Sequence, residues 1–265
     1  MTLQNIALFV GTGKCNANCV HCAGKIHRKY APKEDGIIES DLFYKTLKES
    51  YSQGARSLSI SSSGEPTLSP LAVTKTLQLV YDMKKENREY SWINLYSNGI
   101  RIGEDKKFCE DYLSRWKDLG LKTIYITVHD TNEKRNAEFY HVKSYPSLDL
   151  VVSRIHRAEM LVRSNLVLTK KNIPNCEKFI HVVNDLRKIG FDHVSAWPIR
   201  NSDDKKDLSL SPLEEELDKM SEWVEKNQEP NFRLRLLNEK SRVVYQAGQK
   251  LTLFPDGKLS SSWCN

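Results

Sequence analysis

Short apolar runs rich in β-branched residues alternate along the chain with longer amphipathic segments. The runs predict strands at residues 6–10, 57–61, 92–96, 123–128, 163–168 and 193–199. The segments between them predict helices at residues 41–53, 71–87, 106–119, 148–157 and 176–189, and glycine follows several of these, as it often follows helices. This alternation predicts repeated βα units on a parallel sheet, hence an α/β fold.

The pattern changes beyond residue 200. Ser211 and Pro212 suit the start of a helix at residues 212–227, and apolar and basic residues then alternate at 232–237. Two further runs, at 251–254 and 258–263, flank the turn tripeptide Pro255-Asp256-Gly257 and predict a short C-terminal β-hairpin. We expect a core at residues 1–210 and a tail at residues 211–265, whose helix and hairpin pack on that core.

Length and composition suit a single soluble barrel. The chain has 265 residues, of which 39% are hydrophobic, enough for one large α/β core. Its net charge of +6 arises from 40 basic and 34 acidic residues spread over the whole chain, which favours a solvated surface over a nucleic-acid footprint. No apolar run approaches the roughly 20 residues that cross a bilayer, and the first residues lack signal-peptide features. We expect a cytoplasmic protein with no membrane partner.

The cysteines are unevenly placed. Cys15, Cys19 and Cys22 follow the first predicted strand closely, whereas the other three, at positions 109, 176 and 264, are scattered. Evenly spread disulfide partners would give a different pattern, and clustered thiols in a reducing compartment usually bind metal. The cysteine cluster therefore predicts a metal centre.

Two kinds of metal centre are compatible with three clustered thiols. Three thiolates without an obvious fourth leave one iron of a 4Fe-4S cubane open to an outside ligand. A structural zinc ion needs four ligands, and His21 or Cys264 would have to complete that set. The spacing favours the iron-sulfur cluster and leaves zinc as the alternative.

The motif Cys15-x3-Cys19-x2-Cys22 after the first strand resembles that of the radical S-adenosylmethionine superfamily. The resemblance covers roughly residues 6 to 200 and implies a partial (βα)6 TIM-like barrel. It also implies that the three cysteines bind a 4Fe-4S cluster whose open iron is chelated by S-adenosylmethionine. His21 stands where relatives usually carry a carbocyclic aromatic residue, and the resemblance places it beside the adenine.

Later segments support the resemblance by their order and position at strand ends. The sequence Ser63-Gly64-Glu65-Pro66 is similar to the family's Gly-Gly-Glu-Pro, which receives the methionine ammonium, although a serine replaces the first glycine. By the same resemblance, polar residues after the third and fourth strands reach the ribose or the methionine: Ser97, Asn98, Thr127 and His129. The alternative for these positions is an ordinary loop or strand-end cap.

Arg163, Asn165 and Val167 share one face of the fifth strand, because side chains alternate along a strand. The resemblance implies that Arg163 pairs with the methionine carboxylate and that Asn165 contacts the ribose or carboxylate. Internal hydrogen bonds are the alternative for both. Pro198 and Ile199, at the end of the sixth strand, would place apolar atoms against the adenine.

The family's chemistry implies a function. The enzyme would reductively cleave S-adenosylmethionine at its cluster and use the 5′-deoxyadenosyl radical to abstract a hydrogen atom, in an oxidoreductase or transferase reaction. The fifth strand and the tail hairpin are similar to those of the peptide-modifying (SPASM/twitch-like) relatives, which favours a peptide, an amino acid or another small molecule as substrate. The expected electron donor is a reductase of the flavodoxin or ferredoxin type.

Alternatives remain open at this point. Gly-Glu-Pro-Thr-Leu, at residues 64–68, is also similar to relatives that modify tRNA, so a nucleoside or a tRNA base, and hence a nucleic-acid partner, is the second candidate. A non-catalytic zinc or iron-sulfur electron-transfer module is the third. The tail has one cysteine, Cys264, so no auxiliary cluster is expected. Instead, Cys264 is a hypothetical catalytic donor of the final hydrogen atom, against the simpler alternative of packing.

Overall fold

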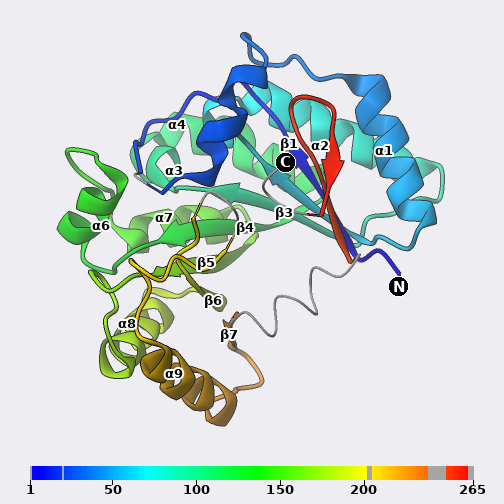
Figure 1. Cartoon of the computed structure of the whole chain (residues 1–265). Helices are drawn as coiled ribbons and strands as arrows, with labels where there is room; N and C mark the ends of the chain where they lie inside the picture. The colour runs from blue at the N-terminus through cyan, green and yellow to red at the C-terminus, as the bar shows by residue number, and fades with distance from the viewer. Residues whose placement is uncertain (1, 20, 202–204, 238–248, 262–265) are drawn as a thin grey trace.

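The structure is a computed structural model that describes residues 2–19, 21–201, 205–237 and 249–261 (Figure 1). Nine strands form one sheet in the order β7-β6-β5-β4-β3-β2-β1-β8-β9. Their bounds are β1 Asn5–Phe9, β2 Ser57–Ser61, β3 Trp92–Ser97, β4 Leu121–Val128, β5 Leu161–Leu168, β6 His193–Pro198, β7 Arg233–Leu236, β8 Lys250–Leu253 and β9 Leu259–Ser260.

The helices connect the strands of this parallel sheet. Neighbouring strands from β7 to β8 pair in parallel, and only β8 and β9 pair antiparallel. The α-helices are α1 Ser40–Ser52, α2 Pro70–Lys85, α3 Ile100–Glu104, α4 Lys106–Phe108, α5 Ser114–Asp118, α6 Glu133–Tyr140, α7 Leu148–Arg157, α8 Cys176–Ile189 and α9 Glu214–Lys226. Two 3-10 helices are η1 Ala23–Tyr30 and η2 Pro66–Leu68, and η3 Cys109–Leu113 is π-helical. The architecture confirms the predicted α/β class and agrees with a partial TIM-like barrel.

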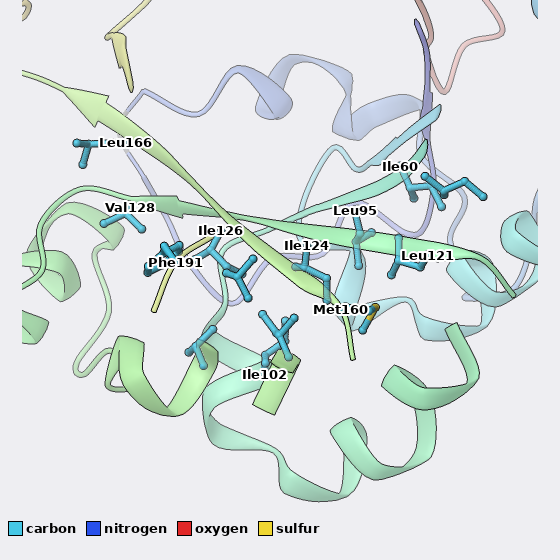
Figure 2. Close-up of a cluster of buried hydrophobic side chains, with 14 of the residues drawn as sticks. Ile60, Leu95, Ile102, Leu121, Ile124, Ile126, Val128, Met160, Leu166 and Phe191 are labelled. Atoms are coloured by element: carbon cyan, nitrogen blue, oxygen red, sulfur yellow. The ribbon is translucent and has the colours of Figure 1, made fainter. Parts of the chain in front are cut away.

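The apolar core lies between the strands and the helices. One set of alternating positions, such as Ile124 and Ile126 on β4, points toward the helices and is completely buried. Figure 2 shows this cluster, in which side chains from β2 to β5 meet Ile102 of α3 and Met160 before β5. The other alternating set faces the interior of the curved sheet and is largely polar, for example Ser59, Asn94 and Thr123. In parallel α/β barrels the ligand sites lie at the carboxyl ends of the strands.

The structure places more strands in the sheet than the six predicted for the barrel. The six predicted strands form β1 to β6, but β7 and β8 extend the same sheet, β7 beside β6 and β8 beside β1. The hairpin is confirmed as β8 and β9, and it joins the sheet instead of lying outside it. The division of the chain at residues 210 and 211 stays a prediction. Cys264 lies outside the described residues.

The helices differ from the predictions at four places. Residues 106–119 form α4, η3 and α5 instead of one regular helix, and the short helices α3 and α6 were not predicted. Helix α9 begins at Glu214, with Leu213 as its N-cap. Ser211 does not cap it because the Ser211 Oγ donates a hydrogen bond to the Ile199 carbonyl at 3.3 Å. Within the described part of the chain, no helix has both the length and the hydropathy needed to cross a bilayer.

Candidate active site

A cavity opens where the carboxyl ends of β1 to β5 meet, the position at which parallel α/β barrels carry their active sites. Its volume is about 260 Å³. We call it the cysteine cavity. It is lined by Cys15, Ala17, Cys19, His21, Cys22, Gly24, Ser61, Ser62, Gly64, Glu65, Pro66, Tyr96, Ser97, Asn98, Thr127, His129, Tyr140 and Val167.

The three clustered cysteines reach this cavity on one loop that follows β1. All three are free thiols and half-buried. Burial raises the pKa of Cys15, and burial together with the neighbouring thiols Cys22 and Cys15 raises the pKa of Cys19 to about 12. Without metal these two thiols are protonated at neutral pH, and bound iron would have to displace their protons, as metals do when they coordinate thiols.

Cys15, Cys19 and Cys22 all line the cysteine cavity from one loop, as three ligands of one metal centre must. Ligands of one zinc ion must converge to about 2.0–2.3 Å from it. Thiolates of a cubane bind different irons, so they need not converge on one point. The donor set of Cys15, Cys19 and Cys22 therefore fits a 4Fe-4S cluster.

Asn98 ties the cysteine loop to the end of β3. Its Nδ2 donates to Asn16 Oδ1 at 2.7 Å and lies 3.9 Å from the Cys15 sulfur. Its Oδ1 accepts from the Ile100 N–H at 3.0 Å, which fixes the orientation of the amide. An N–H group directed at a thiolate stabilises its negative charge and tunes a cluster's potential. Asn98 is thus placed to support the Cys15 ligand.

Glu65 is a buried carboxylate that joins the loop after β2 to the end of β3. Its side chain accepts from the Thr67 N–H at 3.0 Å, the Thr67 hydroxyl at 2.8 Å, the Ser97 hydroxyl at 2.8 Å and the Asn98 N–H at 2.7 Å. Burial raises the pKa of Glu65, and these hydrogen bonds partly offset that effect. Three of the four bonds fall on Oε1, so Oε2 keeps capacity for a ligand ammonium.

We expect Glu65→Ala to destabilise the protein. The Thr67 and Asn98 N–H groups would lose their buried acceptor, at about 1–3 kcal/mol each, partly offset by relief of a buried charge, for a net loss of about 2 kcal/mol. Chemical denaturation of the cluster-free protein measures this loss in the free energy of unfolding. The control is Glu89→Ala, which removes an exposed carboxylate paired with Lys84. Equal stability of the two variants would contradict the structural role of Glu65.

Two histidines face the cavity from different elements. The rings of His21 and His129 lie 5.3 Å apart and edge to face, and the His129 ring stacks on Phe139 at 5.3 Å. The His21 Nε2 and the His129 Nδ1 are both buried without a hydrogen-bond partner. Such orphaned polar atoms in a cavity wall fit a bound ligand with its own donors and acceptors, as a nucleoside has.

Burial, with a smaller contribution from His21, lowers the pKa of His129 to about 3. In the unfolded chain a histidine takes up its proton near pH 6.5, whereas folded His129 stays neutral down to about pH 3, so acid favours unfolding. The neutral His129 makes its full contribution to the free energy of unfolding above about pH 6.5. Below that pH the contribution falls by about 1.4 kcal/mol per pH unit. Between pH 7 and pH 5 we expect the free energy of unfolding to fall by about 2 kcal/mol more in the wild type than in His129→Gln.

Denaturant unfolding of the cluster-free protein at the two pH values measures this difference. His156→Gln is the control, because His156 is more exposed and pairs with Asp192 at 2.9 Å. An unchanged pH dependence in His129→Gln would contradict a neutral, buried His129.

Two structural residues were not predicted from the sequence. The Tyr140 hydroxyl donates to the Thr127 carbonyl at 2.7 Å, and the Tyr140 carbonyl accepts from the Asn18 N–H at 2.9 Å, so α6 holds the cysteine loop. The Asn172 Nδ2 donates to the carbonyls of His129 at 2.5 Å and Val167 at 2.7 Å, which joins the ends of β4 and β5. The bonds from Asn18 to Tyr140 and from Asn172 to His129 join residues far apart in the sequence, so no local pattern indicates them.

The structure brings most of the predicted site residues together. Those that line the cysteine cavity are Cys15, Cys19, His21, Cys22, Gly64, Glu65, Pro66, Ser97, Asn98, Thr127, His129 and Val167. Ser63, Asn165, Pro198 and Ile199 are buried but do not line it. Arg163 lines a different, second cavity, nearer the amino end of β5. Alternation predicts the face of a strand but not the depth along it, so the expected pairing of Arg163 with the methionine carboxylate has no support in this geometry.

Comparison with known proteins gives a family match. A family profile described as the Radical SAM superfamily matches residues 9–195. A GTP 3′,8-cyclase of Campylobacter jejuni subsp. doylei is 29% identical over 162 residues, which cover 60% of this chain and 45% of that protein. The chain thus spans about half the length of the curated relatives that it matches.

Solved structures share the fold at low sequence identity. SuiB of Streptococcus suis, bound to S-adenosylmethionine, has a TM-score of 0.68 at 16% identity, covering 98% of this chain and 60% of that one. SuiB has also been solved with its precursor peptide SuiA, with a TM-score of 0.66. Methylornithine synthase (PylB) has a TM-score of 0.59 at 14% identity, covering 97% of this chain and 74% of that one.

Proposed function

The chain belongs to the radical SAM superfamily, whose members bind S-adenosylmethionine and a 4Fe-4S cluster, and from this premise we propose that it is a radical enzyme whose cluster is held by Cys15, Cys19 and Cys22. When bound, these groups supply a 5′-deoxyadenosyl radical that abstracts a hydrogen atom from the substrate. The observation that carries the proposal is that these thiols share one cavity with Glu65, Asn98 and other carboxyl-end residues.

The protein's own residues would bind and orient the cofactor. Asn98 would stabilise the Cys15 thiolate, and the free capacity of Glu65 Oε2 would accept a hydrogen bond from the methionine ammonium. His21 and His129 would offer the adenosine two ring nitrogens that have no protein partner. Tyr140 would close one wall of the cavity, because it is buried and held by Thr127.

As substrate we propose a peptide or an amino acid. Support comes from SuiB, whose fold matches 98% of this chain. One structure of SuiB holds a precursor peptide. A second candidate is a nucleotide or a nucleoside, because the curated relatives at 29% identity are named GTP 3′,8-cyclase. A flavodoxin- or ferredoxin-type reductase stays the expected electron donor, and a cytoplasmic location stays a prediction.

Cofactor cleavage without substrate tests the reaction class. The anaerobically reconstituted protein, reduced with dithionite, is incubated with S-adenosylmethionine, and 5′-deoxyadenosine and methionine are quantified by mass spectrometry. We expect both products in equal amounts. A reconstituted, folded protein that forms neither product would overturn the proposal.

A further inference from the structure

A second cavity, of about 60 Å³, lies inside the curved sheet on the side of the amino ends of the strands. We call it the inner cavity. It is lined by Asn5, Ser57, Ser59, Asn94, Tyr96, Tyr125, Arg163, Trp197, Arg235, Leu237 and Lys250. These residues come from β1 to β6 and β8, together with Arg235 of β7 and Leu237, which follows it. The lining therefore includes β7 and β8, strands near the two ends of the sheet, which stand apart in Figure 1.

The described lining of the inner cavity is basic. It holds two arginines, Arg163 and Arg235, and no aspartate or glutamate. Burial raises the pKa of Tyr96, so its phenol is neutral and does not compensate the arginines. Two guanidinium groups around a small, partly enclosed space create a positive potential that favours a negatively charged ligand.

Arg163 is held in position but keeps an unused hydrogen-bond donor. Its guanidinium lies over the ring of Tyr125, 4.2 Å from the centroid, which fixes the plane of the group. The Arg163 Nε is buried and has no hydrogen-bond partner. The indole Nε1 of Trp197, on the neighbouring strand, is buried and unpartnered as well. In the strand pairing Trp197 lies opposite Val167, four residues beyond Arg163, but both side chains line the inner cavity. An acceptor bound in that cavity would give these two donors a partner.

Asn94 adds an acceptor to the same cavity. Its Nδ2 donates to the Leu58 carbonyl at 3.5 Å, which orients the side-chain amide. The Oδ1 of the same amide has no hydrogen-bond donor. Asn94 is only 2% exposed, so water does not reach its Oδ1 easily. A buried oxygen without a hydrogen-bond donor costs free energy. The cavity therefore combines donors for a negative group with one acceptor for an N–H or O–H beside it.

We propose that the inner cavity binds an anionic group of the substrate, a carboxylate or a phosphate, through Arg163, Arg235 and Trp197. This inference rests on the proposed function and specifies its substrate. The volume of about 60 Å³ is several times the roughly 10–15 Å³ that one water needs, enough for one such group but not for a whole nucleotide or peptide. The rest of the substrate lies toward the cysteine cavity.

The two cavities are neighbours along the same strands. Tyr96 lines both, and on β5 Arg163 lines the inner cavity while Val167 lines the cysteine cavity. Four residues of strand span about 13 Å. On β2 the corresponding pair, Ser59 and Ser61, is separated by two residues, or about 7 Å. The anionic group is thus remote from the reacting carbon, and its binding would orient that carbon toward the cofactor.

Binding of small anions tests this proposal without requiring turnover. Inorganic phosphate and acetate are titrated separately, at constant ionic strength, into the reconstituted protein and into the cluster-free protein. Intrinsic tryptophan fluorescence and, for phosphate, ³¹P line width report binding. We expect saturable, millimolar binding of at least one anion. The tighter of the two assigns the group as phosphate or carboxylate.

Variants connect that binding to the cavity. Arg163→Gln and Arg235→Gln should each weaken it at least fivefold, and Arg163→Lys should weaken it less. Trp197→Phe should remove the fluorescence response. The matched control is Arg115→Gln, which removes an exposed charge on α5, far from the cavity lining. Arg235 is exposed, so its variant keeps the test valid even if Arg163→Gln does not fold.

Wild-type protein that binds neither anion, or Arg235→Gln and Arg163→Lys variants that both bind as wild type does, would overturn the proposal. Because the readout needs neither cluster nor S-adenosylmethionine, its outcome is separate from that of the proposed function. Anion binding without cofactor cleavage would contradict the radical reaction and leave the anion site standing. Cofactor cleavage without anion binding would contradict the anion site and leave the radical reaction standing.

Discussion

Alanine at any one of Cys15, Cys19 and Cys22 is expected to abolish the cluster, from about four irons per chain to fewer than one, because each thiolate binds a different iron of the cubane. Two remaining ligands do not hold the cluster against loss to solvent. Iron and sulfide analysis after anaerobic reconstitution, with the absorption spectrum, measures the effect. Cofactor cleavage should disappear in parallel.

The matched controls are Cys109→Ala and Cys176→Ala. Both residues are half-buried free cysteines, and neither lines the cysteine cavity. These variants should keep the full iron content. A normal cluster in the Cys19→Ala protein would be incompatible with the assigned ligands.

Gly64→Ala is expected to cost the cluster as well, although residue 64 is not a ligand. A Cβ at this position would lie 2.2 Å from the Lys14 carbonyl oxygen and 2.3 Å from the Gly13 carbonyl oxygen, both in the backbone of the cysteine loop. Backbone atoms cannot rotate away as a flexible side chain does, so the loop must move. We expect less than half of the wild-type iron content, together with an overpacking cost of about 1–3 kcal/mol in stability.

Ser63→Ala is the neighbouring control. The Ser63 hydroxyl is buried and makes no hydrogen bond, so its removal leaves no partner unsatisfied. Iron content and unfolding free energy should stay near those of wild type. If Gly64→Ala assembles the cluster as fully as Ser63→Ala does, close contact between the two loops is not what positions the cysteines.

The sequence predicted the features that depend on local spacing. The cysteine motif and the segment around Glu65 each lie within a few residues, and both reach the cysteine cavity as expected. Strands β1 to β6 were predicted close to their observed bounds. In each of them apolar residues either alternate with polar ones or follow one another without a break. Helices α7 and α8 have strong amphipathic patterns and were predicted with their observed bounds.

Features that depend on distant parts of the chain were not predicted. Helix α6 has the mostly polar sequence EKRNAEFY, so only its tertiary contacts through Tyr140 reveal its importance. Strands β7 and β8 are each four residues long, and their pairing with β6 and β1 is set by sheet geometry. The depth of Arg163 along β5 likewise depends on how the neighbouring strands are staggered.

The most direct test of the central claim is the EPR spectrum of the dithionite-reduced, anaerobically reconstituted protein before and after addition of S-adenosylmethionine. Three cysteine ligands leave one iron open, so the cofactor should bind that iron directly. We predict a reduced 4Fe-4S signal in wild type whose g-values change on addition of S-adenosylmethionine, and no such signal in Cys19→Ala. A cluster signal that S-adenosylmethionine leaves unchanged, or stoichiometric zinc in place of iron, would contradict the account.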